Sequence, residues 1–306
     1  MAASTLTAGP TAPAAPVVVT TKRPVPPGRI AANVLFGVLG AVVFVCSAFP
    51  VYWMVSSSFL PTNLVRATVP TFFPGSDFTV DNYVRAVTDD TRADFLPALQ
   101  TSLTVTFLTL VAALVIAFLA SVAIGRYRFR GRKQFIVAIL VVQMIPGEAM
   151  LLTYFQLIDG WGMLNMVFGL TILYVAMVLP FTVWTLRGFV TAVPVELEEA
   201  AMIDGCSRTR AFWKVTFPLL APGLVSTGVF AFIQAWNEFV LALVIMSRPE
   251  SMTLPVWLRT FQQATKATDY GALMAGSVLV AIPVIVFFLF VQGRMTGGLV
   301  SGAVKG

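Results

Sequence analysis

The sequence predicts an all-α membrane protein with six membrane-spanning helices. Three observations lead to this fold class. The 306 residues are 58% hydrophobic and only 11% charged, whereas soluble domains are about a quarter charged, so a water-soluble domain of this composition could not cover its surface. Apolar runs of about 20 residues, the length a helix needs to cross a bilayer, recur along the chain. Lys and Arg are concentrated in every second connecting segment, as is typical of membrane proteins, whose cytoplasmic loops carry an excess of basic residues.

The elements follow in order from these runs. Residues 1–29 are rich in Ala, Pro, Thr and Val without a helical period, and we expect a disordered tail. The next apolar run is too long for a signal-peptide core and is predicted to be a retained span. The six predicted spans cover residues 30–56, 99–124, 134–157, 165–186, 222–246 and 272–292. They form one membrane domain over residues 30–293, followed by a short tail over residues 294–306.

The third span differs from the others because Pro146-Gly147-Glu148 interrupts it. Such a break persists in a membrane only where protein or a watery cavity satisfies the freed backbone groups. This span therefore indicates either a path or a protein interface.

Basic residues set the orientation. The segments on the side of the N-terminus hold fourteen of them: Lys22, Arg23, Arg29, Arg126, Arg128, Arg130, Arg132, Lys133, Arg187, Arg208, Arg210, Lys214, Arg294 and Lys305. The opposite segments hold six: Arg66, Arg85, Arg92, Arg248, Arg259 and Lys266. This bias predicts that both termini are cytoplasmic. The net charge of +6 is then explained by topology, and no nucleic-acid partner is expected. Residues 126–133 are expected to form a stop-transfer loop, with binding of anionic lipid head groups as the alternative.

The residues for common catalytic sites are missing. The chain contains no His and only two Cys, with neither zinc-ligand spacing nor a disulfide framework, and both cysteines are expected to be small apolar fillers. The phosphate-binding pattern Gly-x-x-x-x-Gly-Lys-Ser/Thr and the hydrolase pattern Gly-x-Ser-x-Gly do not occur. We therefore expect a chain that is not an enzyme and binds no cofactor or metal of its own. Any uphill transport must draw on an ion gradient or on a partner.

Two connections are longer than joining spans requires. The outer one, residues 59–97, is acidic and rich in proline. The inner one, residues 187–221, is a polar island between apolar runs. Pro194 suits the first position of a short helix there, and Glu196, Glu198 and Glu199 then lie in its first turn, where the helix dipole favours negative charge.

One face of this short helix carries small side chains. The face consists of Leu197, Ala200, Ala201 and Asp204, which the helical repeat places on the same side. Its two alanines permit another protein surface to approach closely. Gly205 is expected to end the helix in the left-handed conformation. Ser207 is expected to cap a second helix that runs through Val215 and that Pro218 closes. The alternative is an amphipathic connector that packs only on its own bundle.

The polar island resembles a family signature. Glu199-Ala200-Ala201, then Gly205, then Val215, Phe217 and Pro218 follow the spacing of a motif in permease subunits of bacterial ABC importers. That motif has Ile and Leu where this chain has Val215 and Phe217. Three further stretches resemble the carbohydrate branch of this family, which is related to the maltose permease. They are Asp81-Asn82-Tyr83, Ala235-Trp236-Asn237-Glu238-Phe239 and the tail from Gly298 to Gly306. The resemblance covers the chain from about residue 30 to its end.

The resemblance implies a type I ABC importer permease fold in the cytoplasmic membrane of a bacterium. It implies that the motif forms a coupling helix that docks into a cleft on an ATPase subunit through Glu199, Ala200, Ala201, Asp204, Gly205 and Pro218. It also implies that Ser301, Gly302 and Lys305 of the tail contact the ATPase. The expected partners are a sister permease, two ATPase subunits that hold ATP and Mg, an extracytoplasmic sugar-binding protein, and membrane lipid.

Polar groups inside the spans suggest a translocation path. An ionisable residue in a span is costly and usually faces a cavity or a partner, and a sugar path needs hydroxyl-binding groups beside flat apolar surfaces. The candidate path residues are Gln143, Glu148, Gln234, Trp236, Asn237 and Glu238. The alternative is that Asn237 and Glu238 hold helices together by hydrogen bonds.

These observations favour the transmembrane subunit of an ATP-driven sugar importer. An ion-coupled secondary transporter, with Glu148 or Glu238 carrying the proton, is the alternative, although no inverted repeat is evident. A membrane scaffold without transport is a third possibility, disfavoured by the broken span and the buried acids. The sequence leaves open whether the solute is a disaccharide, an oligosaccharide, an amino sugar or a glycerol phosphoester.

Overall fold

The computed structural model describes residues 27–89, 93–262 and 268–300. Within these ranges the secondary structure is helical and contains no strand, as the sequence predicts. The chain divides into two units, residues 1–51 and residues 52–306. The first unit contains most of α1 (Pro27–Ser58), which carries Pro50 in its interior. This helix begins three residues before the predicted start of the first span.

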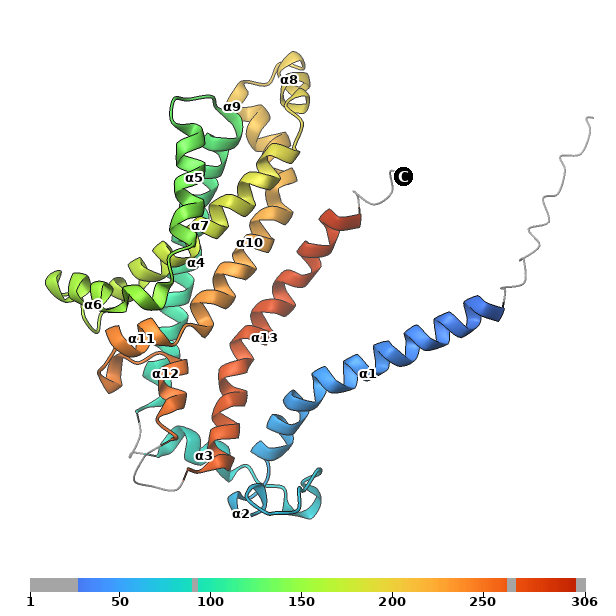
Figure 1. Ribbon diagram of the computed structural model, residues 1–306, viewed down its shortest axis with the longest axis vertical. Helices are drawn as coiled ribbons and strands as arrows, with labels where there is room; N and C mark the ends of the chain where they lie inside the picture. Colours follow the sequence, from blue (N-terminus) through green and yellow to red (C-terminus); the bar gives the residue numbers. More distant parts are fainter. Residues whose placement is uncertain (1–26, 90–92, 263–267, 301–306) are drawn as a thin grey trace, which may run out of the picture. The chain divides into compact units, whose positions relative to one another are not determined.

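The predicted spans are present as long apolar helices. Five helices of the described residues are long and apolar enough to cross a membrane, and a bent pair raises the number to six. The second unit contains four of the five, formed by α4 (Phe95–Arg126), α7 (Val167–Ala192), α9 with α10, and α13 (Tyr270–Val300). Figure 1 shows α4, α7 and α10 side by side, with α13 along α10. The number of spans predicted from the sequence is therefore matched when the bent pair counts as one.

The bent pair corresponds to the interrupted third span. α5 (Arg132–Gln143) and α6 (Leu151–Gly160) are joined through a short 3-10 turn, η2 (Gly147–Met150), and their directions differ by 86°. α5 packs against α7, whereas α6 packs against α11 (Val240–Ile245). Pro146 adopts an extended backbone conformation at the break. The sequence located this interruption correctly.

Small residues bring the central helices close together. α4 packs most extensively on α7, and its buried Ala113, Ala117 and Ser121 recur every fourth residue, which places them on one side of the helix. On α10, a Cβ added to Gly223 would overlap the ring of Phe189. Lipid tails are as apolar as leucine, so such close backbone packing is what holds membrane helices together.

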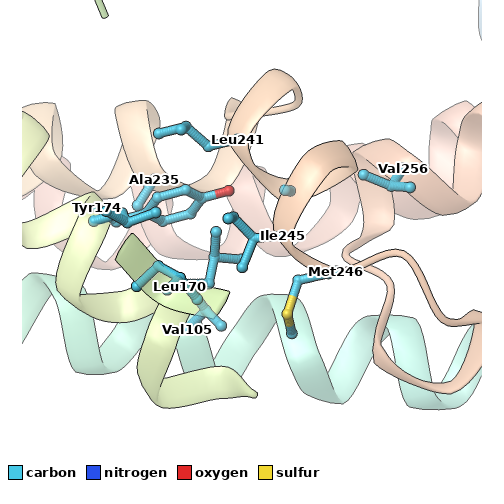
Figure 2. Packing of buried hydrophobic residues seen from close by; sticks show 11 residues of the cluster. Val105, Leu170, Tyr174, Ala235, Leu241, Ile245, Met246 and Val256 are labelled. Carbon is cyan, nitrogen blue, oxygen red and sulfur yellow. The ribbon is translucent and has the colours of Figure 1, made fainter. Parts of the chain in front are cut away.

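A second core lies where α6 and α11 meet the bundle. Figure 2 shows Leu170 and Tyr174 of α7 packed with Leu241 and Ile245 of α11. Ile245 is completely buried. This cluster fixes the short α11 against the long helices, next to several of the candidate path residues.

The end of the bundle opposite α8 is held by polar contacts. The outer connection forms α2 (Thr62–Val65), η1 (Gly75–Asp77) and α3 (Asp81–Thr88). The fully buried Asn82 donates its side-chain amide to the carbonyls of Ser58 and Leu60, and Arg85 pairs with Asp269 at 3.1 Å. The Asp81-Asn82-Tyr83 stretch thus joins the end of α1 to the segment that leads into α13.

The fifth span differs from its prediction at both ends. A continuous helical segment begins at α9 (Arg208–Ala211), passes through a π-helical turn, η3 (Phe212–Thr216), and continues as α10 (Phe217–Asn237). The prediction that Pro218 closes a helix is therefore wrong. The amide of Phe217 donates to the carbonyl of Phe212, so the hydrogen-bond ladder shifts immediately before Pro218, where the proline has no N–H to contribute.

Other boundaries move by a turn or more. The predicted span to residue 246 ends at Asn237, and α11 is a separate short helix. α13 runs to Val300, into the stretch expected to be a tail. α7 reaches Ala192, so the inner connection is shorter than residues 187–221. Between α11 and α13, η4 (Pro249–Ser251) and α12 (Leu254–Arg259) complete the chain.

Candidate functional site

The polar island forms a helical hairpin at one end of the bundle. Its first helix is α8 (Glu196–Ile203), and α9 follows after a tight turn. Figure 1 shows α8 and α9 together at the end of the second unit farthest from α3 and α12. α8 packs against α9 and the π-helical turn, so its position is tied directly to the start of the fifth span.

The turn after α8 has the geometry that the sequence predicts. Gly205 has a φ of +87°, in the left-handed region. The Cys206 amide donates to the carbonyl of Ala201 at 3.0 Å, and the Gly205 amide donates to that of Met202 at 3.1 Å. This pair of bonds is a Schellman motif, which satisfies carbonyls at the helix end.

The caps of the two helices are also largely as predicted. Ser207 accepts a hydrogen bond from the Arg210 amide and caps α9. Glu196, Glu198 and Glu199 lie in the first turn of α8. Pro194 precedes the capping residue Val195 instead of occupying the first helical position.

The free side of α8 is small and apolar. Leu197, Ala200 and Asp204 are exposed, and Ala201 is half-buried. Ile203 is 87% exposed at the tip of the hairpin. An isolated exposed apolar residue is ordinary, but adjacent ones on a hairpin tip indicate a contact surface. Glu199 is exposed beside this surface.

Glu198 is the residue whose role the sequence did not reveal. It points inward, is buried, and accepts a hydrogen bond of 2.6 Å from the Thr216 hydroxyl of the π-helical turn. Its other neighbour is Arg126 at the end of α4, with Nη2 3.5 Å from Oε1. Glu198 thus joins α8 to two long helices. Three glutamates within four positions gave no indication which one faces inward, and Thr216 lies between the apolar residues Val215 and Phe217.

Close backbone packing supports the same junction. A Cβ added to Gly125 would come within 2.6 Å of Cγ1 of Val190. The last turn of α4 therefore lies directly against the last turns of α7, which lead into α8. The hairpin and the ends of α4 and α7 form one packed group.

The candidate path residues divide into three situations. Gln143, Glu148, Gln234 and Asn237 are exposed on the surface of the chain. Trp236 is 1% exposed, stacks on Phe232 in the core, and therefore presents no open surface. Glu238 is half-buried. In the part of the chain that the structure describes, the hydrogen bonds of Asn237 and Glu238 do not lead to Gln143 or Glu148.

Glu238 is fully engaged between two helices. Its carboxylate accepts a hydrogen bond from the Tyr174 hydroxyl at 2.7 Å. It also accepts from the amides of Leu241 at 2.8 Å and Ala242 at 3.0 Å, in the first turn of α11. This geometry corresponds to the sequence alternative in which Glu238 holds helices together. Ser301, Gly302 and Lys305 lie outside the described residues.

Comparison with known proteins places the chain in a family. The sequence profile of the family described as "Binding-protein-dependent transport system inner membrane component" matches residues 117–296. The chain belongs to this family. The matched stretch contains the hairpin of α8 and α9, three of the five candidate spans and the bent pair of α5 and α6. Members of this family are permease subunits of ABC transporters and are not themselves enzymes.

Curated relatives extend the match over nearly the whole chain. The diacetylchitobiose uptake system permease protein DasC of Streptomyces coelicolor is 46% identical over 91% of this chain and 98% of its own length. The trehalose transport system permease protein SugB of Mycobacterium tuberculosis is 35% identical over 89% of this chain and 97% of its own. The trehalose/maltose permease protein MalG of Thermococcus litoralis is 34% identical over 88% and 96%. The resemblance to carbohydrate ABC permeases is therefore confirmed.

A solved structure confirms the fold. A chain of a bacterial ABC transporter involved in import of the acidic polysaccharide alginate matches with a TM-score of 0.75 and 22% identity, over 89% of this chain and 99% of that one. At this identity the match shows the arrangement of helices alone. The chain has the fold of an ABC importer permease and is a multi-pass membrane protein.

Proposed function

We propose that this chain forms half of the translocation path for a disaccharide or an oligosaccharide in an ATP-driven importer. It couples to ATPase subunits through the α8 hairpin, Glu199 to Gly205. The observation that supports this role most directly is the hairpin itself. Its outer side is small, apolar and exposed, while its inner side is bonded to α4 and the start of the fifth span. A movement of an ATPase subunit docked on the outer side of the hairpin would therefore be transmitted to the helix bundle.

The proposed orientation has the hairpin and both termini in the cytoplasm. The support is the excess of Lys and Arg in the segments on the hairpin side of the spans. The location is then the cytoplasmic membrane of a bacterium. The acidic connection that contains α2 and α3 faces outward, where a binding protein would deliver the sugar.

The proposed mechanism is rigid-body coupling between two states. ATP and Mg bind to the two partner ATPase subunits, which close and carry α8 with them. The docked surface consists of Glu199, Ala200, Ala201, Asp204, Gly205 and Pro218, and the tail residues Ser301, Gly302 and Lys305 add contacts. The bundle then opens outward, and hydrolysis resets it.

The proposed partners are a sister permease, two ATPase subunits and an extracytoplasmic sugar-binding protein. One solved relative is described in complex with a pentasaccharide-bound periplasmic protein, which supports the last of these. Because the chain is similar to a diacetylchitobiose permease, N-acetylated amino-sugar disaccharides are among the candidate solutes. The exposed Gln143, Glu148, Gln234 and Asn237 are the path residues we propose to face the sister subunit, with Trp236 and Glu238 behind them.

The decisive experiment is co-purification with the ATPase subunit together with uptake by reconstituted vesicles. We expect ATP-dependent uptake from the complex, and loss of co-purification in Gly205→Asp and Glu199→Lys. Uptake by this chain alone, driven by a proton gradient and indifferent to ATP, would overturn the proposal. Thermal stabilisation of the binding protein by a panel of sugars would then identify the solute.

The ion-coupled alternative is not favoured. The Glu238 carboxylate already accepts three hydrogen bonds within the chain, so it serves as a structural link between α7 and α11. A proton carrier would instead face a cavity that water or ions reach. Glu148 is exposed at the break of the third span and is the remaining candidate for such a role.

A further inference from the structure

A pocket of about 390 Å³ lies beside the α8 hairpin, between the end of α4 and the start of the fifth span. We propose that it binds the head group of an anionic phospholipid, with the acyl chain lying along α4. The site differs from the outer surface of α8, which the proposed function assigns to the ATPase. Its walls combine an apolar half, which would contact the acyl chain, and a basic half, which would contact the phosphate of the head group.

The apolar half consists of membrane-spanning residues. Phe118, Leu119 and Val122 line it from the last turns of α4, and Trp213 lines it from the π-helical turn. Leu119 is 63% exposed and Trp213 is 52% exposed. Tyr127, which also lines the pocket, directly follows the apolar helix. Tryptophan and tyrosine at the end of a span are typical of the head-group level of a bilayer.

The basic half consists of two arginines from different elements. Arg208 of α9 lies over the Tyr127 ring at 5.6 Å, which directs its guanidinium along the pocket wall. Arg126 lines the pocket with only 10% of its side chain exposed. Its Nε has no hydrogen-bond partner within the described chain, and its contact with Glu198 is long, at 3.5 Å. A buried guanidinium with unused donors is costly to leave unmatched, and phosphate oxygens fit its planar fork.

The combination favours a lipid over a soluble anion. A free phosphate would use the arginines and leave the aromatic and aliphatic wall exposed. A zwitterionic lipid would bring a positive choline group towards two arginines, with Glu198 as the one acidic residue in the lining. An anionic lipid supplies apolar surface and negative charge together, and basic residues at the cytoplasmic leaflet attract such lipids by about 1 kcal/mol each.

Tryptophan quenching tests the site directly in the purified full-length chain, measured with and without the ATPase subunits. Vesicles containing brominated phosphatidylglycerol or brominated phosphatidylcholine are the two probes, and Trp213→Phe identifies the part of the signal that comes from the pocket. We expect Trp213 to be quenched at a several-fold lower fraction of phosphatidylglycerol than of phosphatidylcholine. Arg208→Gln should reduce this preference about fivefold, the effect of one basic residue. Arg210→Gln is the matched control, because Arg210 lies on the same short helix but is not part of the pocket lining.

The outcomes separate the possible occupants. Equal quenching of Trp213 by the two lipids in the unaltered protein overturns the proposal and requires no variant to fold. Displacement of the phosphatidylglycerol signal by millimolar inorganic phosphate or glycerol phosphate shows a soluble-anion site, and also overturns it. Loss of quenching only when the ATPase subunits are bound shows that a protein fills the pocket, with the same consequence. These measurements require no sugar uptake, so they remain valid if the proposed function fails.

Discussion

At the scale of single residues, the contact that matters most is the buried pair of Glu198 and Arg126. Each side chain has about a tenth of its surface exposed. We expect Glu198→Ala to destabilise the chain by about 3 kcal/mol, because removing one partner leaves the other charge buried and unpaired. We expect uptake per ATP hydrolysed to fall as well, because α8 would then move without α4. The thermal unfolding midpoint and the ratio of hydrolysis to uptake are the two measurements.

A double-mutant cycle separates the pair from general damage. Glu196→Ala is the matched control, since Glu196 lies exposed in the same first turn, and we expect it to change stability by less than about 0.5 kcal/mol. In the double variant of Glu198→Ala and Arg126→Met, the loss should be smaller than the sum of the single losses. Simple additivity would show that the two side chains do not act on each other.

Replacing glycine by alanine is expected to lower the stability of the chain at Gly205 and to raise it at Gly188. The φ of +87° at Gly205 lies in the left-handed region, so Gly205→Ala should cost about 1 kcal/mol. Gly188 lies within α7, and a Cβ there would meet no atom within 4 Å. Gly188→Ala should therefore stabilise the chain by about 0.5 kcal/mol or more. Unfolding midpoints of the two purified variants in one detergent test the pair, and equal shifts would contradict the αL assignment.

At the scale of helices, the length of the apolar runs predicted that the spans exist but did not predict where each helix ends. Residues 222–246 read as one apolar run, yet the run contains a helix end at Asn237 and a separate α11. The polar residues at this break, Gln234, Asn237 and Glu238, suggested a translocation path and not a helix end. The break depends on the Glu238 carboxylate, which occupies the first amides of α11. The interruption at Pro146-Gly147 was predictable because proline and glycine have known backbone preferences.

Glu238 therefore has a testable structural role at the level of α11. Glu238→Ala removes the acceptor of two amides and leaves the Tyr174 hydroxyl only its longer contact, 3.4 Å, with the carbonyl of residue 238, and loss of such a cap should cost about 1–2 kcal/mol. Glu238→Gln keeps one acceptor oxygen and removes the charge. We expect the Gln variant to retain ATP-driven uptake, whereas a proton carrier would lose it. Tyr174→Phe, which removes one donor alone, should have the smallest effect of the three.

At the scale of the whole molecule, the hairpin is a small part that is rigidly joined to the bundle. The sequence predicted its helix, its glycine turn and the cap at Ser207, because these depend on local backbone chemistry. It did not predict that Glu198 would bridge to Arg126 and Thr216, because that contact joins residues far apart in the chain. The same reason explains Trp236, whose amphipathic side chain suggested a path but which packs into the core with Phe232. Local chemistry is readable from sequence, whereas the direction of one side chain in a bundle depends on its neighbours.

The two native cysteines offer a test of orientation and docking in the intact molecule. Cys206 is half-buried, directly after Gly205 in the hairpin turn, and Cys46 lies within the apolar α1. A membrane-impermeant maleimide should therefore label Cys206 in inside-out vesicles and not in intact cells. Co-expressed ATPase subunits should slow this labelling, because they cover the hairpin tip. Cys206→Ser should abolish the signal and Cys46→Ser should leave it unchanged. Labelling of Cys206 from the outside of intact cells would reverse the proposed topology, since ATP is available only in the cytoplasm and the hairpin must face it for coupling to occur.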